Sequence, residues 1–352
     1  MGRPIPEIEK EALDITAMQP ILQSVVRERF GAGANILDMS TGHIKRGVYR
    51  YTIRMNGKYS ADAPLSIIGK VYDDEDAGKT SFEKMQRLWK KGFNKLEPVG
   101  IKIPFAYNYL PGLRLLLMEE APGKPLKKAI KKQIATPEQI AMFAKTLAKL
   151  HHFPLIFGEP FTIETHLEKR CNNLAAPMAN DFPEIAHDIS QVVETAKRRQ
   201  SQNIQRDFTL AHGDFHFSQV HVNTGDYWLL DIDPLHYGDP AYDVAMVLFV
   251  MKQESAKRGT SDYIAALRDA FIAAYFAESD WTIASRIPLQ EAMINLKRAC
   301  KRYHWQDEDG WRDLIPQQIQ QSVTCLKMME KFPAPASEKD VVELYNSCPG
   351  NI

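Results

Sequence analysis

The pattern of apolar positions changes character once along the chain. In the first third, short segments rich in β-branched and aromatic residues, such as "VYRYTIRM" (48–55) and "LSIIGKVY" (65–72), have the composition of strands. From residue 136 onward, apolar residues recur at helical spacing over long segments, as in 136–152 and 287–305. The sequence therefore predicts an α+β protein whose first part is β-rich and whose second part is mainly helical.

The first part is predicted to contain a helix, then five strands with a short helix among them. The first helix covers 18–30 and stops at Gly31, and the second covers 80–93 with Thr80 or Ser81 as its N-cap. The predicted strands are 34–40, 48–55, 65–72, 103–109 and 113–120, with a loop at 41–47 and a turn at Asn56-Gly57. These elements predict a first domain over residues 1–120.

The second part, residues 121–352, is predicted to be mostly helical. Its first long helix begins with Thr136 as N-cap and Pro137 at the first helical position. Further helices are expected at 241–252, 261–276, 287–305 and 311–332, and a small β insert at 208–211, 219–222 and 227–232. The second domain is thus a helical unit with an inserted β segment.

Composition limits the partners. A chain of 352 residues suits two domains, and its 44 basic residues balance 44 acidic ones, so no overall field favours nucleic acid or a membrane surface. No run of eighteen apolar residues occurs and the N-terminal stretch has no apolar signal region, which predicts a cytoplasmic protein. A monomer or a homodimer is expected. Its partner is expected to be a small molecule.

The cysteines do not form a recognisable framework. Cys171, Cys300, Cys325 and Cys348 are far apart and form no C-x-x-C motif, so reduced thiols are expected.

The stretch "AHGDFHFSQVHV" (211–222) permits two interpretations. His212, Asp214 and His216 alternate and would share one face of a strand, as in some metal-dependent hydrolases, with His236 as a further ligand. Alternatively, Asp214 and Gln219 lie five residues apart on one loop and Asp231 leaves the next strand. One carboxylate then deprotonates a hydroxyl, while the amide oxygen and the other carboxylate hold Mg²⁺, which is the arrangement of phosphoryl transfer.

Three segments together resemble one family. "HGDFHFSQVHV", "WLLDIDPLHYGDPAYDVA" and "LLLMEEAPGKPL" are similar to the aminoglycoside phosphotransferase and choline kinase family, and the resemblance covers residues 18 to 330. It implies a bilobal protein-kinase-like fold with a nucleotide-binding lobe at 1–120 and a catalytic and acceptor-binding lobe at 121–352. It also implies ATP, with GTP as the alternative, Mg²⁺, and transfer of the γ-phosphate to a hydroxyl of a sugar, amino sugar or amino alcohol.

The resemblance assigns roles in the second lobe. Asp214 matches the catalytic aspartate, His212 a histidine that fixes the catalytic loop, and Asp231 the metal-binding aspartate, with Asp233 as a further metal-loop carboxylate. Gln219 takes the place of the usual asparagine; it keeps the carbonyl oxygen that Mg²⁺ needs but is longer by one methylene. This departure keeps open the alternative of a degenerate, nucleotide-binding kinase with a regulatory role.

The resemblance also places the nucleotide. Lys70 matches the lysine that contacts nucleotide phosphates, and Glu83 is expected to pair with it. Phosphates are expected under the predicted 41–47 loop and the adenine edge at the end of the last strand, with the contacting residues Ser40, Thr41, Gly42, Met118, Glu119 and Ala121.

The acceptor side is less defined by the sequence. His216 and His236 lie near the predicted base, and the segment "KRACKRYHWQDEDGW" contributes Arg302 and Trp305. Its lysines and arginines suit a phosphorylated or carboxylated acceptor, or a sugar, better than a polycation; the alternative, which the composition favours, is a solvated helix end.

Overall fold

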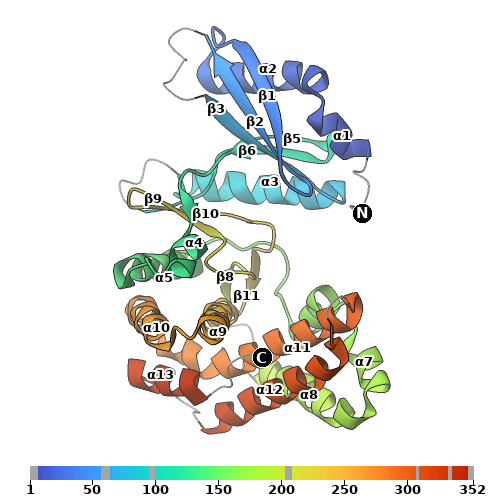
Figure 1. Cartoon of the computed structure of the whole chain (residues 1–352), viewed down its shortest axis with the longest axis vertical. Helices are drawn as coiled ribbons and strands as arrows, with labels where there is room; N and C mark the ends of the chain where they lie inside the picture. Colours follow the sequence, from blue (N-terminus) through green and yellow to red (C-terminus); the bar gives the residue numbers. More distant parts are fainter. Residues whose placement is uncertain are drawn as a thin grey trace. The chain divides into compact units, whose positions relative to one another are not determined.

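The computed structural model describes residues 7–56, 64–94, 100–202, 208–306, 309–331 and 335–347 (Figure 1). Cys348 and Gly57 of the predicted Asn-Gly turn lie outside these residues. The chain divides into two compact units, one formed by Met1–Lys124 with His221–Asp233 and the other by Pro125–Val220 with Pro234–Ile352.

The first unit contains a five-stranded sheet, as the strand pattern predicted. Its strand order is β1-β2-β3-β6-β5, and all neighbouring strands are antiparallel. The strands are β1 (Ile36–Lys45), β2 (Val48–Met55), β3 (Leu65–Val71), β5 (Ala106–Leu110) and β6 (Leu115–Glu119).

The predicted loop at 41–47 is wrong. Strand β1 continues through it to Lys45, with Thr41 opposite Tyr51 and Gly42 opposite Arg50, and the chain reverses in a tight turn where Gly47 has a φ of 68°. The small and polar residues of "TGH" have little strand propensity, but pairing with β2 overrides this preference. Residues 41–45 are therefore part of a long β-hairpin.

One face of the sheet is covered by an N-terminal helix. After α1 (Glu7–Leu13), helix α2 (Ile15–Phe30) begins at Asp14, whose carboxylate accepts the Thr16 N–H at 2.8 Å. Met18 and Leu22 of α2 are fully buried in one cluster with alternate residues of β2, such as Tyr51. Burying each such side chain contributes about 1.5–3 kcal/mol, so this apolar face holds α2 to the sheet.

Helix α3 (Glu75–Lys90) packs against β5 and β6 and begins earlier than predicted. Its N-cap is Asp74, which accepts the Ala77 N–H at 2.7 Å, so Thr80 and Ser81 are not caps. Glu75 and Asp76 in the first turn interact favourably with the positive end of the helix dipole. The helix therefore begins before the first residue of its apolar pattern. Ser81 and Glu83 therefore lie inside the helix.

A second, four-stranded sheet has the order β4-β10-β9-β7. Its strands are β4 (Ile101–Lys102), β10 (Asp226–Leu229), β9 (Val220–Asn223) and β7 (Lys124–Pro125). Strand β10 pairs in parallel with β4, and Lys102 forms a 2.8 Å ion pair with Asp226. Residues 221–233, which the sequence had placed in the domain 121–352, therefore belong to the first unit.

The second unit is mainly helical, as expected. Helix α5 (Pro137–His151) begins with the predicted Thr136 cap, which forms a capping box with Gln139. The other helices of eight or more residues are α8 (Ala186–Gln202), α9 (Ala241–Arg258), α10 (Ser261–Phe276), α11 (Ile287–Trp305), α12 (Trp311–Lys331) and α13 (Glu338–Ser347). A two-stranded sheet joins β8 (Thr209–Ala211) to β11 (His236–Gly238), a strand the sequence did not predict.

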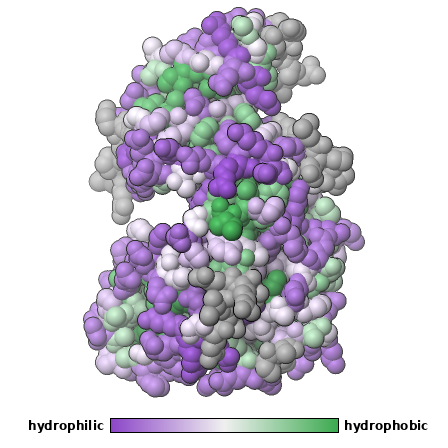
Figure 2. All heavy atoms as spheres, turned by 180° about the vertical axis from the view of Figure 1, so that it is seen from behind, coloured by the Kyte–Doolittle hydropathy of each residue, from purple (hydrophilic) through white to green (hydrophobic). Residues whose placement is uncertain are grey.

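The surface seen in Figure 2 is mostly hydrophilic, with apolar residues gathered in a few groups. Within the described ranges, every helix is too short or too polar to cross a membrane.

Candidate active site

The loop that follows β8 presents Asp214. Phe215 and Phe217 are almost fully buried, and their rings lie 4.6 and 5.0 Å from the ring of Phe143 on α5. Both phenylalanines are buried in the core, whereas Asp214 and His216, which alternate with them in sequence, stay half-buried and accessible. Aromatic packing thus sets the direction of the candidate base.

Asp243, at the start of α9, braces this loop through hydrogen bonds with its main chain. Its carboxylate is fully buried and accepts the main-chain N–H groups of His212 and Gly213, at 2.6 and 2.8 Å, and it lies 3.2 Å from His151 Nε2. Burial alone would raise the pKa of Asp243, but the hydrogen bond and charge of His151 outweigh it and lower the pKa to about 2. Asp243 is therefore a carboxylate at neutral pH. The hydrogen bond from His212 comes from its main chain, so the role expected of its side chain in fixing the loop stays a prediction.

Gly213 is required by the same arrangement. Its φ is 83°, and a Cβ there would lie 2.7 Å from Arg170 Nη2 and 2.8 Å from His236 Cε1. The glycine of the "HGD" motif therefore serves both the backbone conformation and the close approach of two side chains.

Replacing Gly213 with alanine is expected to lower the free energy of unfolding by about 1–3 kcal/mol and to reduce turnover, because both the loop and Arg170 must move. Thermal unfolding monitored by circular dichroism measures the first effect. Gly158→Ala is the matched control, since Gly158 also has a positive φ, 70°, but has open space around its Cβ position. Equal destabilisation by the two variants would contradict the importance of the close approach.

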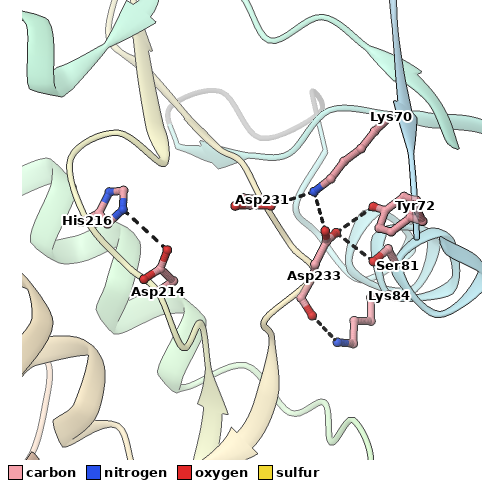
Figure 3. A network of polar contacts seen from close by, with 8 residues as sticks. All are labelled: Lys70, Tyr72, Ser81, Lys84, Asp214, His216, Asp231 and Asp233. Atoms are coloured by element: carbon pink, nitrogen blue, oxygen red, sulfur yellow. Dashed lines mark hydrogen bonds and ion pairs between the residues drawn. The ribbon is translucent and has the colours of Figure 1, made fainter. Parts of the chain in front are cut away.

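Two nitrogen groups flank the Asp214 carboxylate. His216 Nε2 lies 3.6 Å from Oδ2, as Figure 3 shows, and Lys297 Nζ of α11 lies 3.9 Å from Oδ1. His216 Nδ1 accepts the Ser218 N–H at 3.2 Å, so a neutral ring carries its proton on Nε2, toward Asp214. Burial, together with Lys127 and His212, lowers the pKa of His216 against the opposing effect of Asp214. The neutral imidazole therefore points its Nε2–H toward the Asp214 carboxylate.

The first unit gathers a second set of polar groups around Lys70. Lys70 Nζ on β3 contacts Asp231 Oδ1 at 2.9 Å and also pairs closely with Asp233 (Figure 3). Burial alone would lower the pKa of Lys70, but the two carboxylates outweigh it and raise the pKa. Asp231 has a φ of 55°, a conformation uncommon outside glycine and found at functional sites.

Asp233 is held from several directions. Its Oδ1 accepts hydrogen bonds from Tyr72 and Ser81 hydroxyls, both at 2.8 Å, and its main-chain carbonyl accepts one from Lys84 Nζ at 2.8 Å (Figure 3). Ser81 and Lys84, three residues apart, share one face of α3. These contacts fix the short segment that carries both aspartates.

The expected pair of Lys70 with Glu83 is wrong for this structure. Within the described part of the chain, Lys70 forms its ion pairs with Asp231 and Asp233 instead. Because α3 begins at Glu75, it turns Ser81 and Lys84, and not Glu83, toward this network.

The histidines of the "HGDFH" motif do not form a metal site. His212 is fully buried, and His236 Nδ1 forms a 2.8 Å hydrogen bond with the Pro234 carbonyl. Across the described ranges, no three or more His, Cys, Asp or Glu side chains are placed to hold a metal together. The histidine-based hydrolase centre is therefore not formed. Asp231 and Asp233 are hard oxygen ligands that fit Mg²⁺, which usually takes one or two carboxylates along with water and phosphate oxygens.

The other residues predicted to contact nucleotide lie in the first unit. Ser40 and Gly42 are exposed on β1, and Thr41 is half-buried beside them. Met118 and Glu119 end β6, where the Glu119 N–H already donates to the Phe105 carbonyl at 2.8 Å, and the buried Ala121 follows. Their contacts with a nucleotide remain predictions.

The predicted acceptor residues are dispersed within the second unit. His216 lies beside Asp214, and Trp305 is 57% exposed and lines a cavity next to it. Arg302, by contrast, donates a hydrogen bond to Gln318 Oε1 on α12, at 2.5 Å. His236 packs against the Phe161 ring, whose centroid is 4.4 Å away.

Sequence reasoning missed several residues that build the site. Phe215 and Phe217 were detectable from the alternation of phenylalanine with polar residues in "DFHFSQ". The positions of Tyr72, Lys84 and Lys297 depend on contacts with residues distant in sequence, so no local signal marked them.

The β-rich unit, with a lysine paired to two aspartates, and the helical unit, with its braced aspartate loop, share the protein-kinase-like fold of solved small-molecule kinases. The profile of the phosphotransferase enzyme family matches residues 78–286, and the chain belongs to that family. A comparison with curated proteins finds no significant match.

Solved structures share the fold at low sequence identity. A choline/ethanolamine kinase family protein from Mesorhizobium loti has a TM-score of 0.57 at 14% identity, covering 96% of this chain and 99% of that chain. An ethanolamine kinase from Plasmodium vivax has a TM-score of 0.58 at 14% identity, covering 94% and 97%. An amicoumacin kinase in complex with AMP-PNP and Ca²⁺ has a TM-score of 0.59 at 11% identity, covering 96% and 100%.

Proposed function

We propose that this protein transfers the γ-phosphate of ATP to a hydroxyl of a small molecule, with Asp214 as the catalytic base. The observation that carries the proposal is the placement of Asp214: it is half-buried on a loop braced by Asp243, with His216 and Lys297 beside its two oxygens. A fixed carboxylate next to a cavity suits removal of a hydroxyl proton during phosphoryl transfer.

The nucleotide side of the proposal rests on Lys70. Its ammonium group lies between Asp231 and Asp233, and it would be available to nucleotide phosphates if the two carboxylates held a divalent cation. Asp231, Asp233 and the Gln219 carbonyl oxygen are the proposed ligands of Mg²⁺. When bound, the ion neutralises charge on the phosphate oxygens. The AMP-PNP and Ca²⁺ in the amicoumacin kinase structure support nucleotide and divalent-metal use.

The proposal is tested by ADP release from Mg-ATP in the presence of sugars, amino sugars and amino alcohols, each compared with a blank without acceptor. Acceptor-dependent release supports the kinase function. Nucleotide binding without release for any acceptor would instead favour the regulatory alternative, for which Gln219 is the supporting feature.

Gln219 is expected to work as a metal ligand despite its extra methylene. Gln219→Asn should keep turnover within about tenfold of the natural protein, whereas Gln219→Leu, which removes the carbonyl oxygen, should raise the Mg²⁺ concentration for half-maximal rate about tenfold or more. ADP release across a magnesium series measures both. An unchanged magnesium requirement in Gln219→Leu would exclude the ligand role.

A further inference from the structure

A cavity in the second unit opens beside the candidate base. It has a volume of about 380 Å³, which is large enough for a small metabolite. Three segments line most of this cavity: the loop with Gly213 and Asp214, the turn 169–172, and helix α11 from Lys297 to Trp305. Pro234 completes the lining. All of these residues belong to the second unit.

The lining of this cavity is strongly basic. Lys297 and Lys301 are four residues apart on α11 and so share a helix face, and Lys169 and Arg170 line the cavity from the neighbouring π-helical turn. Asp214 is the one carboxylate among the described lining residues. Since the whole chain carries equal numbers of basic and acidic residues, 44 each, this excess of positive charge is a local feature.

Arg170 is fixed in place. Its guanidinium group lies 4.4 Å from the Phe161 ring centroid and 3.9 Å from that of Tyr242, so aromatic rings, and not a carboxylate, hold it. Within the described residues, neither Arg170, Lys169 nor Lys301 forms an ion pair with an acidic side chain. A cation held without a carboxylate partner next to a cavity is available to an anionic ligand.

The positive charges on α11 oppose one another. Loss of hydration lowers the pKa of Lys301, and the neighbouring Lys297 and Arg298 lower it further, against the opposing effect of Asp214. An anion bound in the cavity would relieve this repulsion.

Resting on the proposed kinase function, we infer that the acceptor is an anionic alcohol, with its hydroxyl at Asp214 and a phosphate monoester or carboxylate bound by Lys301, Lys169 and Arg170. Lys297 contacts Asp214, and Lys301 follows one turn later, about 6 Å along the helix axis. The hydroxyl and the anionic group are therefore separated by about the length of a sugar, as in a sugar phosphate or a sugar acid.

In the reaction, a bond forms between the acceptor oxygen and the γ-phosphorus while the bond from that phosphorus to the β-γ bridging oxygen breaks. The hydroxyl proton passes to the Asp214 carboxylate, and ADP leaves. The inferred acceptor differs in charge from the amino alcohols named for the similar choline/ethanolamine kinase family and ethanolamine kinase structures.

The test compares acceptors that share a carbon skeleton and differ in charge. Glucose, glucose 6-phosphate, gluconate and glucosamine are assayed with saturating Mg-ATP, alongside the corresponding glycerol and ribose series and choline. The anionic members should have a kcat/KM about tenfold or more above their neutral and cationic counterparts. Equal or faster turnover of the cationic members would overturn the inference and leave the kinase function intact.

Binding measured without nucleotide separates the two proposals. Glucose 6-phosphate and inorganic phosphate should each raise the thermal unfolding temperature of the natural protein, and Lys301→Glu should abolish the shift. A shift without turnover of any acceptor would contradict the kinase function and support the anion site. No shift with either probe would overturn the anion site.

The lysine itself is tested by Lys301→Ala, with Lys327→Ala as the matched control, since Lys327 is an exposed lysine on α12 that does not line the cavity. Lys301→Ala should raise KM for the best anionic acceptor about tenfold and leave KM for ATP unchanged. A raised KM for ATP with an unchanged KM for the acceptor would show that Lys301 serves the nucleotide, and would overturn the inference.

Discussion

Asp214→Asn is expected to lower turnover by about 10²–10⁴-fold, the range for loss of a positioned general base. Asparagine keeps the shape of the side chain but cannot accept the hydroxyl proton, so binding should persist while the chemical step fails. The loop should remain in place, because Asp243 and the buried Phe215 and Phe217 hold it independently of the carboxylate. ADP release with the best acceptor measures the rate, and titration calorimetry with AMP-PNP measures nucleotide affinity.

Asp262→Asn is the control for this prediction, because Asp262 is an exposed aspartate in the first turn of α10, in the same unit. It should retain turnover. A turnover for Asp214→Asn within a factor of a few of the natural rate would exclude Asp214 as the base.

Asp243→Asn is expected to destabilise the protein by about 3–5 kcal/mol, because it breaks a fully buried, charged network. The two oxygens of Asp243 accept from His212 and Gly213, and an amide can present only one oxygen to these two main-chain donors. The other donor would face an NH₂ group and lose its partner, and His151 would lose its charged neighbour. Urea unfolding monitored by circular dichroism measures the change.

The destabilisation should depend on pH. The pKa of Asp243 is lowered to about 2 in the folded protein, below its usual value of about 4, so its contribution is complete above the unfolded pKa and is lost as pH falls through the folded one. The stability difference between natural protein and variant should be largest near pH 6 and shrink between about pH 4 and pH 2.

Asp280→Asn is the matched control for the buried brace. Asp280 also accepts a main-chain N–H, that of Thr282 at 2.8 Å, but it is exposed at the start of a short helix. Its effect on stability should be much smaller. Comparable destabilisation by the two variants would show that the buried network around Asp243 is not special.

Local patterning predicted much of the fold. The strands predicted at 48–55 and 65–72 and the helix predicted at 136–152 were confirmed. Within each segment, the spacing of apolar residues indicates the type of element and its buried side. The Thr136 cap was likewise predictable, since a cap and its helix lie within a few residues. The family resemblance of the "HGD" and "DID" segments was confirmed by the family match.

By itself, then, the sequence determined most of the strands, most of the long helices and the family, and it marked Asp214, Asp231 and Lys70 as candidates. Only the tertiary structure decided that β1 runs through the predicted loop, that 221–233 joins the first unit, and that Lys70 pairs with Asp231 rather than Glu83. The basic cavity beside Asp214 also depends on it, since the turn carrying Arg170 and the Lys301 face of α11 are far apart in sequence. The physical reason is that the spacing of apolar residues depends on which side of a segment is buried, and so it can be seen locally. The partner of a strand or of a charged side chain depends on packing between segments far apart in sequence.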